Sequence, residues 1–202
     1  MTIETSLFPE LTAPAGATPL PGFRYRPDLI DAEEEAALAA EIAGLPFKPF
    51  EFQGYLANRR VAAFGFSYDY GRRRLEPAPD LPPFLAALRL KVAGFAGRTP
   101  ERFRQVLITE YTPGAGIGWH RDKKQYGEVV GVSLLSPATF RLRRREGERW
   151  RRIAHVIQPR SAYHLAGEAR HAWEHSIPEH RWLRYALTFR TLAEDGASPA
   201  GE

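Results

Sequence analysis

The second half of the sequence is a run of short segments rich in β-branched and aromatic residues, separated by glycine and proline. Segments of this length and composition are typical of β-strands. They lie at 104–111, 128–135, 138–144, 151–157, 161–167 and 182–192. Many consecutive short strands of this kind predict a sandwich or a jelly roll.

Two helices are predicted ahead of these strands. The first begins near Asp31, which can cap it together with Glu34, and it ends at Gly44. The second follows the proline-rich segment 76–83, whose last two prolines suit a first helical turn. An earlier strand pair is expected around 50–54 and 59–70. Helices first and strands afterwards predict an α+β fold.

The chain length of 202 residues suits a single domain, which we place at 23–192. Residues 1–22 are expected to form a flexible arm and residues 193–202 a disordered tail. The absence of cysteine excludes a disulfide scaffold, a thiolate zinc site and a cysteine nucleophile, and it favours a reducing, cytoplasmic location. No long apolar run or signal-peptide pattern is present, so no membrane association is expected. A monomer is expected.

The net charge of +4 comes from basic residues that are almost all arginine, which makes a polyanionic partner plausible. The segment 141–152 contains seven arginines and two glutamates. A hairpin with this composition can lie along a phosphate backbone and bind it in a salt-sensitive way. A solvated surface, or a general preference for arginine, would produce the same pattern, and composition leaves these alternatives open.

His120 and Asp122 are two residues apart in an extended segment, so their side chains point to the same face. An imidazole and a carboxylate placed in this way can bind one metal ion, although a surface pair would look the same. About fifty residues later come His171 and His175. We expect His175 to be the third ligand, because Trp173 and other apolar residues alternate with it, and His171 to lie at the surface. Two histidines and one carboxylate are typical of non-haem iron oxygenases.

Arg184 and Arg190 share one face of the last predicted strand. Two long guanidinium side chains on one face can bind opposite ends of a small dicarboxylate. A two-faced strand with its arginines in water is the alternative.

Taken together, the motifs LITEYTPGAGIGWHRD, VVGVSLL, FRLR, GEARHAWEHSIP and RYALTFR resemble the AlkB family of Fe(II)- and 2-oxoglutarate-dependent dioxygenases. The resemblance covers about Leu107 to Leu192 and extends more loosely back to Phe50. It implies a double-stranded β-helix (jelly roll) with N-terminal helices and a substrate-lid hairpin. It also implies Fe(II) as the cofactor, with 2-oxoglutarate and O2 as co-substrates.

The same resemblance assigns roles to individual residues. The iron ligands would be His120, Asp122 and His175. The residues that hold 2-oxoglutarate would be Tyr111 and Arg184 at the distal carboxylate, Arg190 at the carboxylate beside the keto group, and Thr109. Relatives often have asparagine where this chain has Thr109 and Ala186, which puts the affinity for the co-substrate in question.

The segment 58–71 resembles the substrate lid of the family's nucleic-acid repair members. Tyr70 would stack on a flipped base and Tyr68 would offer a hydroxyl beside it, with Arg59 and Trp119 as further substrate contacts. A tyrosine-rich strand that only packs on the sheet is the alternative. Lys123 stands close to the metal motif, where some repair members carry acidic residues.

The resemblance therefore implies an oxidative demethylase of N-alkylated bases, of the 1-methyladenine or 3-methylcytosine type, in single-stranded DNA. The products would be formaldehyde, succinate and CO2. Oxidation of RNA, of a protein or of a small molecule is an open alternative. A non-enzymatic jelly-roll module that binds nucleic acid is another.

Overall fold

The computed structural model describes residues 20–52 and 55–193. Within these residues, three α-helices and two 3-10 turns accompany the strands: α1 (Ala32–Ala43), η1 (Pro83–Leu85), α2 (Ala86–Ala96), η2 (Pro100–Arg102) and α3 (Gly167–His171). The strands before α2 are β1 (Phe23–Arg26), β2 (Lys48–Phe52), β3 (Tyr55–Phe64), β4 (Phe66–Asp69) and β5 (Arg74–Pro77). Those after α2 are β6 (Phe103–Tyr111), β7 (Ile117–His120), β8 (Tyr126–Leu134), β9 (Ala138–Glu146), β10 (Arg149–Ile157), β11 (Ala162–Leu165), β12 (Glu174–Ile177) and β13 (Arg184–Leu192).

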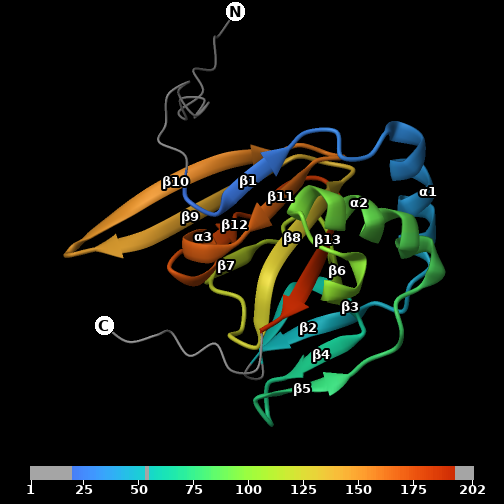
Figure 1. Cartoon of the computed structure of the whole chain (residues 1–202), viewed down its shortest axis with the longest axis horizontal. Helices are drawn as coiled ribbons and strands as arrows, with labels where there is room; N and C mark the ends of the chain where they lie inside the picture. The colour runs from blue at the N-terminus through green and yellow to red at the C-terminus, as the bar shows by residue number, and fades with distance from the viewer. Residues whose placement is uncertain (1–19, 53–54, 194–202) are drawn as a thin grey trace, which may run out of the picture.

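Two antiparallel sheets form the body of the protein. The large sheet has seven strands in the order β1-β11-β8-β13-β6-β3-β2, and the small sheet has four in the order β10-β9-β12-β7. Side chains from both sheets meet in one buried cluster, which contains Phe140 of β9 and Tyr163 of β11. Their rings lie 4.5 Å apart. The expectation of an α+β jelly roll is confirmed by this arrangement of layers (Figure 1).

The other face of the large sheet packs against α1 and α2, which Figure 1 shows together on one side of it. The capping box of α1 is formed as predicted, because the Asp31 side chain accepts from the Glu34 amide at 2.8 Å and Glu34 accepts in return. Leu187 and Phe189 of β13 lie fully buried in this helix-facing core. Arg184 and Arg190 lie on the opposite face of the same strand, so the predicted alternation is confirmed.

The strand predicted at 59–70 divides at Gly65. This glycine has a φ of +74°, and an added Cβ would lie 2.0 Å from the Arg104 carbonyl oxygen. The chain turns at this point, so β4 pairs with β5 instead of continuing the pairing of β3 with β2. The segment that carries Tyr68 and Tyr70 therefore belongs to a separate hairpin, at the lower end of the molecule in Figure 1.

The segment around His171 and His175 also differs from the expected strand junction. It begins with the short helix α3, and β12 follows with only four residues. The buried Arg170 of α3 donates to the carbonyl oxygens of Lys123, Tyr126 and Gly127 at 2.7–2.8 Å. This short helix therefore holds the loop that follows Asp122. The predicted prolines near α2 form the 3-10 turn η1 ahead of the helix.

Most of the predicted arm and tail lies outside the described residues. Of the arm, Leu20–Gly22 are described: Leu20 is buried, and the Gly22 carbonyl accepts from the Ala166 amide at 2.9 Å. Of the tail, only Ala193 is described. No helix among the described residues is long and apolar enough to cross a membrane.

Replacing Gly131 with alanine should destabilise the fold. Gly131 lies opposite Tyr163 in the sheet, and an added Cβ would lie 2.2–2.5 Å from three atoms of the buried tyrosine ring. We expect Gly131→Ala to lower the free energy of unfolding by about 1–3 kcal/mol, as overpacking of a core does. Chemical denaturation measures this change.

The control is Gly94→Ala in α2, because no atom lies within 4 Å of an added Cβ there. This substitution should raise stability by about 0.5–1 kcal/mol. The double variant Gly131→Ala/Tyr163→Leu should lose less than the sum of its single variants. Strict additivity would contradict the proposed clash.

Candidate active site

The two histidines predicted to bind metal face each other across the small sheet. His120 of β7 and His175 of β12 are register partners, and their ring centroids are 4.3 Å apart. Asp122 lies just beyond the end of β7, with its Oδ2 atom 3.7 Å from Nε2 of His175. The structure thus brings together three side chains that are up to 55 residues apart in the sequence.

A buried arginine of the large sheet holds Asp122. Arg190 donates from Nε and Nη2 to Oδ1 of Asp122 at 3.0 and 2.6 Å, and from Nη1 to Gln105 at 2.9 Å. Burial opposes the charge on Asp122, but the Arg190 guanidinium and the neighbouring histidines hold the pKa of its carboxyl well below its usual value. Asp122 is therefore a carboxylate at neutral pH.

Both histidines are neutral at neutral pH. Burial, followed by the neighbouring His120, lowers the pKa of His175 to about 3. Burial also lowers the pKa of His120. The Nδ1 atom of His120 lies 2.9 Å from the Gly118 carbonyl oxygen, to which it can only donate, so the neutral ring keeps a lone pair on Nε2. A neutral imidazole with a free lone pair is the form that binds a metal ion.

Among residues 20–52 and 55–193, no three histidine, aspartate or glutamate side chains converge in the arrangement of a formed metal centre. The predicted three are in contact, but Asp122 directs Oδ1 toward Arg190. Two neutral imidazoles and one carboxylate nevertheless form the donor set that suits Fe(II). The residues present therefore fit this metal by their chemistry.

Arg184 supplies an unsatisfied cationic group on the same face of β13. Its side chain is 1% exposed, and its Nε donates to the Ser133 hydroxyl at 2.9 Å. Its Nη1 atom has no hydrogen-bond partner among the described residues. The guanidinium carbon lies 5.2 Å from the ring centroid of Tyr111, its register partner on β6. A buried N–H without a partner is costly, so this position suits a carboxylate ligand.

The two positions where relatives often carry asparagine are neighbours. Thr109 of β6 and Ala186 of β13 are register partners, and both are buried. Along the two paired strands they lie between Arg184 and Arg190. A ligand bound between the two arginines would therefore meet both substituted positions side by side.

The predicted lid tyrosines lie beside the loop that follows Asp122. The rings of Tyr68 and Tyr70 pack edge to face, with centroids 5.0 Å apart. The ammonium group of Lys123 lies 5.1 Å from the centroid of Tyr68 and 4.9 Å from that of Tyr70. The lid hairpin and the metal motif are thus joined through the residue that directly follows Asp122.

The other two predicted substrate contacts lie in different surroundings. Arg59 of β3 is the register partner of Tyr111, and its guanidinium carbon lies 4.0 Å from the ring centroid of Phe50. Trp119 instead packs against Arg141 and Arg143, with guanidinium carbons 5.1 and 4.4 Å from its ring centroid. Trp119 therefore contacts the arginines of β9, while the neighbouring His120 faces His175.

Several polar residues of the site carried no motif in the sequence. Gln105 and Ser133, which hold the two arginines, are both buried. For Ser133, a hydroxyl between valine and leucine was the available signal. Gln105 gave none, because its strand also contains Arg104, Thr109 and Glu110. Arg170 offered no such signal, because its three carbonyl partners depend on the packing of α3 against the loop.

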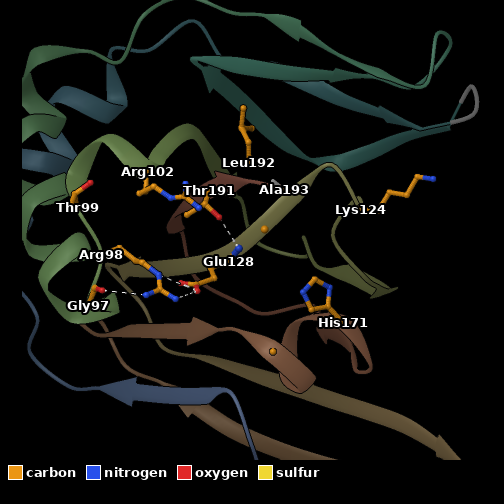
Figure 2. Close-up of a pocket in the computed structure, with 12 residues that line it drawn as sticks. Gly97, Arg98, Thr99, Arg102, Lys124, Glu128, His171, Thr191, Leu192 and Ala193 are labelled. Carbon is orange, nitrogen blue, oxygen red and sulfur yellow. Dashed lines mark hydrogen bonds and ion pairs between the residues drawn. The ribbon is translucent and has the colours of Figure 1, made fainter. Parts of the chain in front are cut away.

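A surface cavity of about 910 Å³ lies apart from these residues. Arg98, Lys124, Glu128 and His171 are part of its lining, and none of the predicted site residues is (Figure 2). Figure 2 shows Arg98 directed at Glu128, with which it forms an ion pair. His171 is exposed there, in agreement with its expected surface position.

Comparison with known proteins supports the relationship suggested by the motifs. An Arabidopsis thaliana protein named "Alkylated DNA repair protein ALKBH8 homolog" is 27% identical over 186 residues, covering 80% of this chain and 52% of that protein. The Mus musculus "tRNA (carboxymethyluridine(34)-5-O)-methyltransferase ALKBH8" is 27% identical over 166 residues, covering 78% of this chain and 24% of that protein. The chain thus spans about half the length of the first relative and about a quarter of the second.

Solved structures confirm the jelly-roll fold. The structure of OsALKBH1 aligns with a TM-score of 0.64 at 16% identity, covering 86% of this chain and 98% of that one. A prolyl-4-hydroxylase from Pseudomonas putida aligns with a TM-score of 0.57 at 16% identity, covering 86% of this chain and 94% of that one.

The sequence profile of the 2OG-Fe(II) oxygenase superfamily matches residues 24–190, which include every residue of the candidate site and all of both sheets except the first residue of β1 and the last two of β13. The expected enzyme class and the expected use of Fe(II), 2-oxoglutarate and O2 are thereby confirmed. The chain belongs to the 2OG-Fe(II) oxygenase superfamily.

Proposed function

We propose that this oxygenase hydroxylates an N-alkyl group on a nucleobase of a single-stranded nucleic acid. The observation that carries the proposal is the contact of the lid tyrosines with Lys123, directly after the metal motif. Aromatic rings beside a metal motif suit a flat base that has been taken out of its stack.

His120, Asp122 and His175 would hold Fe(II) in this proposal. Their contacts and the neutral state of both imidazoles support the assignment. When bound, the metal and its co-substrate supply the oxidation of a C–H bond, coupled to the decarboxylation of 2-oxoglutarate to succinate. Arg190 keeps Asp122 ionised and orients it, so the protein prepares the carboxylate before metal arrives.

Arg184 and Tyr111 would bind the distal carboxylate of 2-oxoglutarate. The unpartnered Nη1 atom of Arg184 supports this role, since a carboxylate oxygen would satisfy it. Arg190 would lie at the carboxylate beside the keto group, and the Thr109 hydroxyl would add a hydrogen bond. The inner face of β13, which carries both arginines, supports this orientation of the co-substrate.

Tyr70 would stack on the extruded base, and Tyr68 and Arg59 would contact it or its phosphate. The hydroxylated N-methyl group would then leave as formaldehyde: its C–N bond breaks with the electron pair staying on the ring nitrogen, and the hydroxyl proton is released. The reaction consumes one O2 and one 2-oxoglutarate, and it yields succinate, CO2 and formaldehyde. The protein's part is to orient the base and to keep the site closed to water.

The choice between DNA and RNA rests on the relatives. One relative is named as an alkylated-DNA repair protein, and the mouse relative as an enzyme of tRNA. Our first candidate substrate is 1-methyladenine or 3-methylcytosine in single-stranded DNA. Oxidation of a tRNA base is the second, favoured by the name of the mouse relative.

Succinate production tests the proposed substrate class. Protein is loaded with Fe(II) in the absence of oxygen. It is then mixed in air, together with 2-oxoglutarate, with single-stranded DNA bearing 1-methyladenine, with the same methylated sequence as RNA, or with the unmethylated strands. We expect a methylated strand to raise succinate and its unmethylated counterpart not to, with formaldehyde released in an amount equal to the rise. Stimulation by a peptide or a small metabolite, and not by either nucleic acid, would overturn the proposed substrate class while keeping the oxygenase chemistry.

Removing one proposed ligand should abolish metal binding. We expect His175→Ala to lose stoichiometric binding of Mn(II), used as an oxygen-stable probe, because one of three donors is missing. Calorimetry measures binding without any turnover. His171→Ala is the matched control, since this exposed histidine lies only four residues away. Unchanged Mn(II) affinity in His175→Ala would refute the ligand assignment.

Arg184→Met should weaken co-substrate binding with the metal site intact. It removes the guanidinium but keeps a long side chain in the buried position, so we expect the KM for 2-oxoglutarate to rise at least tenfold. The affinity for Mn(II) without co-substrate should change little. An unchanged KM would show that the unpartnered Nη1 does not face the co-substrate.

A further inference from the structure

A row of arginines and tryptophans lies on one face of the small sheet, outside the candidate active site. We call it the arginine–tryptophan ladder, and its members in spatial order are Arg141, Trp119, Arg143, Trp150 and Arg145. The guanidinium carbon of Arg143 lies 4.4 Å from the centroid of Trp119 and 4.2 Å from that of Trp150. Arg141 and Arg145 contact the same two rings at 5.1 and 5.7 Å. Cations and indole rings therefore alternate along the row.

Strand alternation explains why the ladder faces away from the core. Phe140 and Leu142 of β9 are buried between the sheets, so the arginines that alternate with them point outward. Trp150 of β10 is the register partner of Arg145, and Arg152 is that of Arg143. Both tryptophans thus reach the outer face of β9 from opposite sides. Figure 1 shows that the β9–β10 hairpin extends well beyond the rest of the molecule.

The ladder, to which we add the neighbouring Arg152 of β10, carries an excess of positive charge. Arg143 is paired with Glu174 at 2.7 Å, and Arg141 donates to the Ser176 hydroxyl at 3.0 Å. Arg145 and Arg152 are exposed, and neither forms an ion pair with any carboxylate in the described part of the chain. Arg145 also donates to the Gly147 carbonyl oxygen at 3.0 Å, so Arg145 and Arg152 keep their charges unpaired and available to a phosphate.

The combination of groups favours a nucleic-acid strand over other polyanions. Guanidinium groups bind phosphates in two-point fashion, and both guanidinium and indole planes stack on bases. An acidic peptide would use the charges but would have no flat groups for the rings. An anionic membrane would likewise use the charges but would offer no flat rings for the guanidinium and indole planes to stack on.

The ladder also lies on the strands of the candidate active site. Trp119 directly precedes His120, and Ser176 directly follows His175. β7 is the edge strand of the small sheet, and the loop beyond it contacts the lid hairpin through Lys123. A nucleic-acid strand that lies across the outer face of the small sheet therefore has to pass only the β7 edge to place a base beside the lid hairpin.

We propose that the ladder binds the part of a single-stranded nucleic acid that flanks the reacting base. This inference rests on the proposed function for the identity of the polymer. It gives Trp119 a role in binding a flanking nucleotide instead of the reacting one. The contact is independent of sequence and of the lesion, since phosphates and ring faces are present in every strand.

Binding of an unmethylated strand to metal-free protein tests the ladder separately from the chemistry. Fluorescence anisotropy is measured with a labelled oligouridylate of roughly 20 nucleotides over a series of salt concentrations. We expect Arg145→Ala/Arg152→Ala to reduce the slope of log K against log salt by about 1.4 and to weaken binding roughly 10- to 30-fold at low salt. Trp150→Ala should weaken binding at least fivefold, and Trp150→Phe should restore most of it.

The control Arg26→Ala/Lys48→Ala removes the same charge from exposed residues of β1 and β2, the two edges of the large sheet. It should bind nearly as the parent protein does, and thermal unfolding checks that every variant is folded. Equal losses in ladder and control variants would overturn the proposal. The proposal would also be overturned if polyglutamate or phosphatidylserine vesicles competed as strongly as unlabelled oligonucleotide and bound Trp150→Ala as tightly as the parent protein.

Failure of the proposed function gives a different pattern. If the ladder variants weaken binding but no methylated strand raises succinate, the proposed role of the ladder is retained and the proposed demethylase activity is refuted. Conversely, Arg145→Ala/Arg152→Ala should turn over a methylated trinucleotide at the parental rate, because a trinucleotide has only one nucleotide on each side of the reacting base and these two arginines lie on β9 and β10, the strands of the small sheet farthest from β7. A loss of that turnover would overturn the assignment of the ladder to flanking nucleotides.

Discussion

The buried ion pair between Arg190 and Asp122 connects the two sheets at the site. Arg190 belongs to β13 in the middle of the large sheet, and Asp122 follows the edge strand of the small one. Neither charge tolerates burial alone, and removing one partner of such a pair typically costs about 3–5 kcal/mol. Gln105 satisfies the remaining side of the guanidinium. The loop that carries the candidate ligands is therefore positioned by the large sheet as much as by its own strand.

The two arginines of β13 are alike in the sequence but differ in the fold. Arg190 has protein partners at all three of its guanidinium nitrogens, whereas Nη1 of Arg184 has no partner among the described residues. Arg190 therefore holds Asp122 in addition to its proposed role at the co-substrate, and Arg184 keeps one N–H for a ligand. Period-two alternation can place both on one face, but it cannot show which of them is already satisfied.

Much of the fold follows from local pattern, and the rest depends on packing. The helix cap at Asp31, the alternation in β13 and the pair His120 and Asp122 can be read from neighbouring residues. The separate lid hairpin depends on the close approach of Gly65 to the Arg104 carbonyl, which no local pattern encodes. The contacts of Trp119 with two arginines more than twenty residues away are likewise not encoded by a local pattern. Long-range contacts of this kind are the part that propensity and spacing leave open.

β7 is a four-residue strand at the edge of its sheet, and it is joined to β12 by two register pairs with an irregularity between them. Short edge strands open in local fluctuations that leave the remaining fold intact. Two of the proposed iron ligands are on or next to this strand, while the third lies inside the sheet. If these residues hold iron, release of the metal would require β7 and the Arg190–Asp122 ion pair to open, and not unfolding of the whole domain.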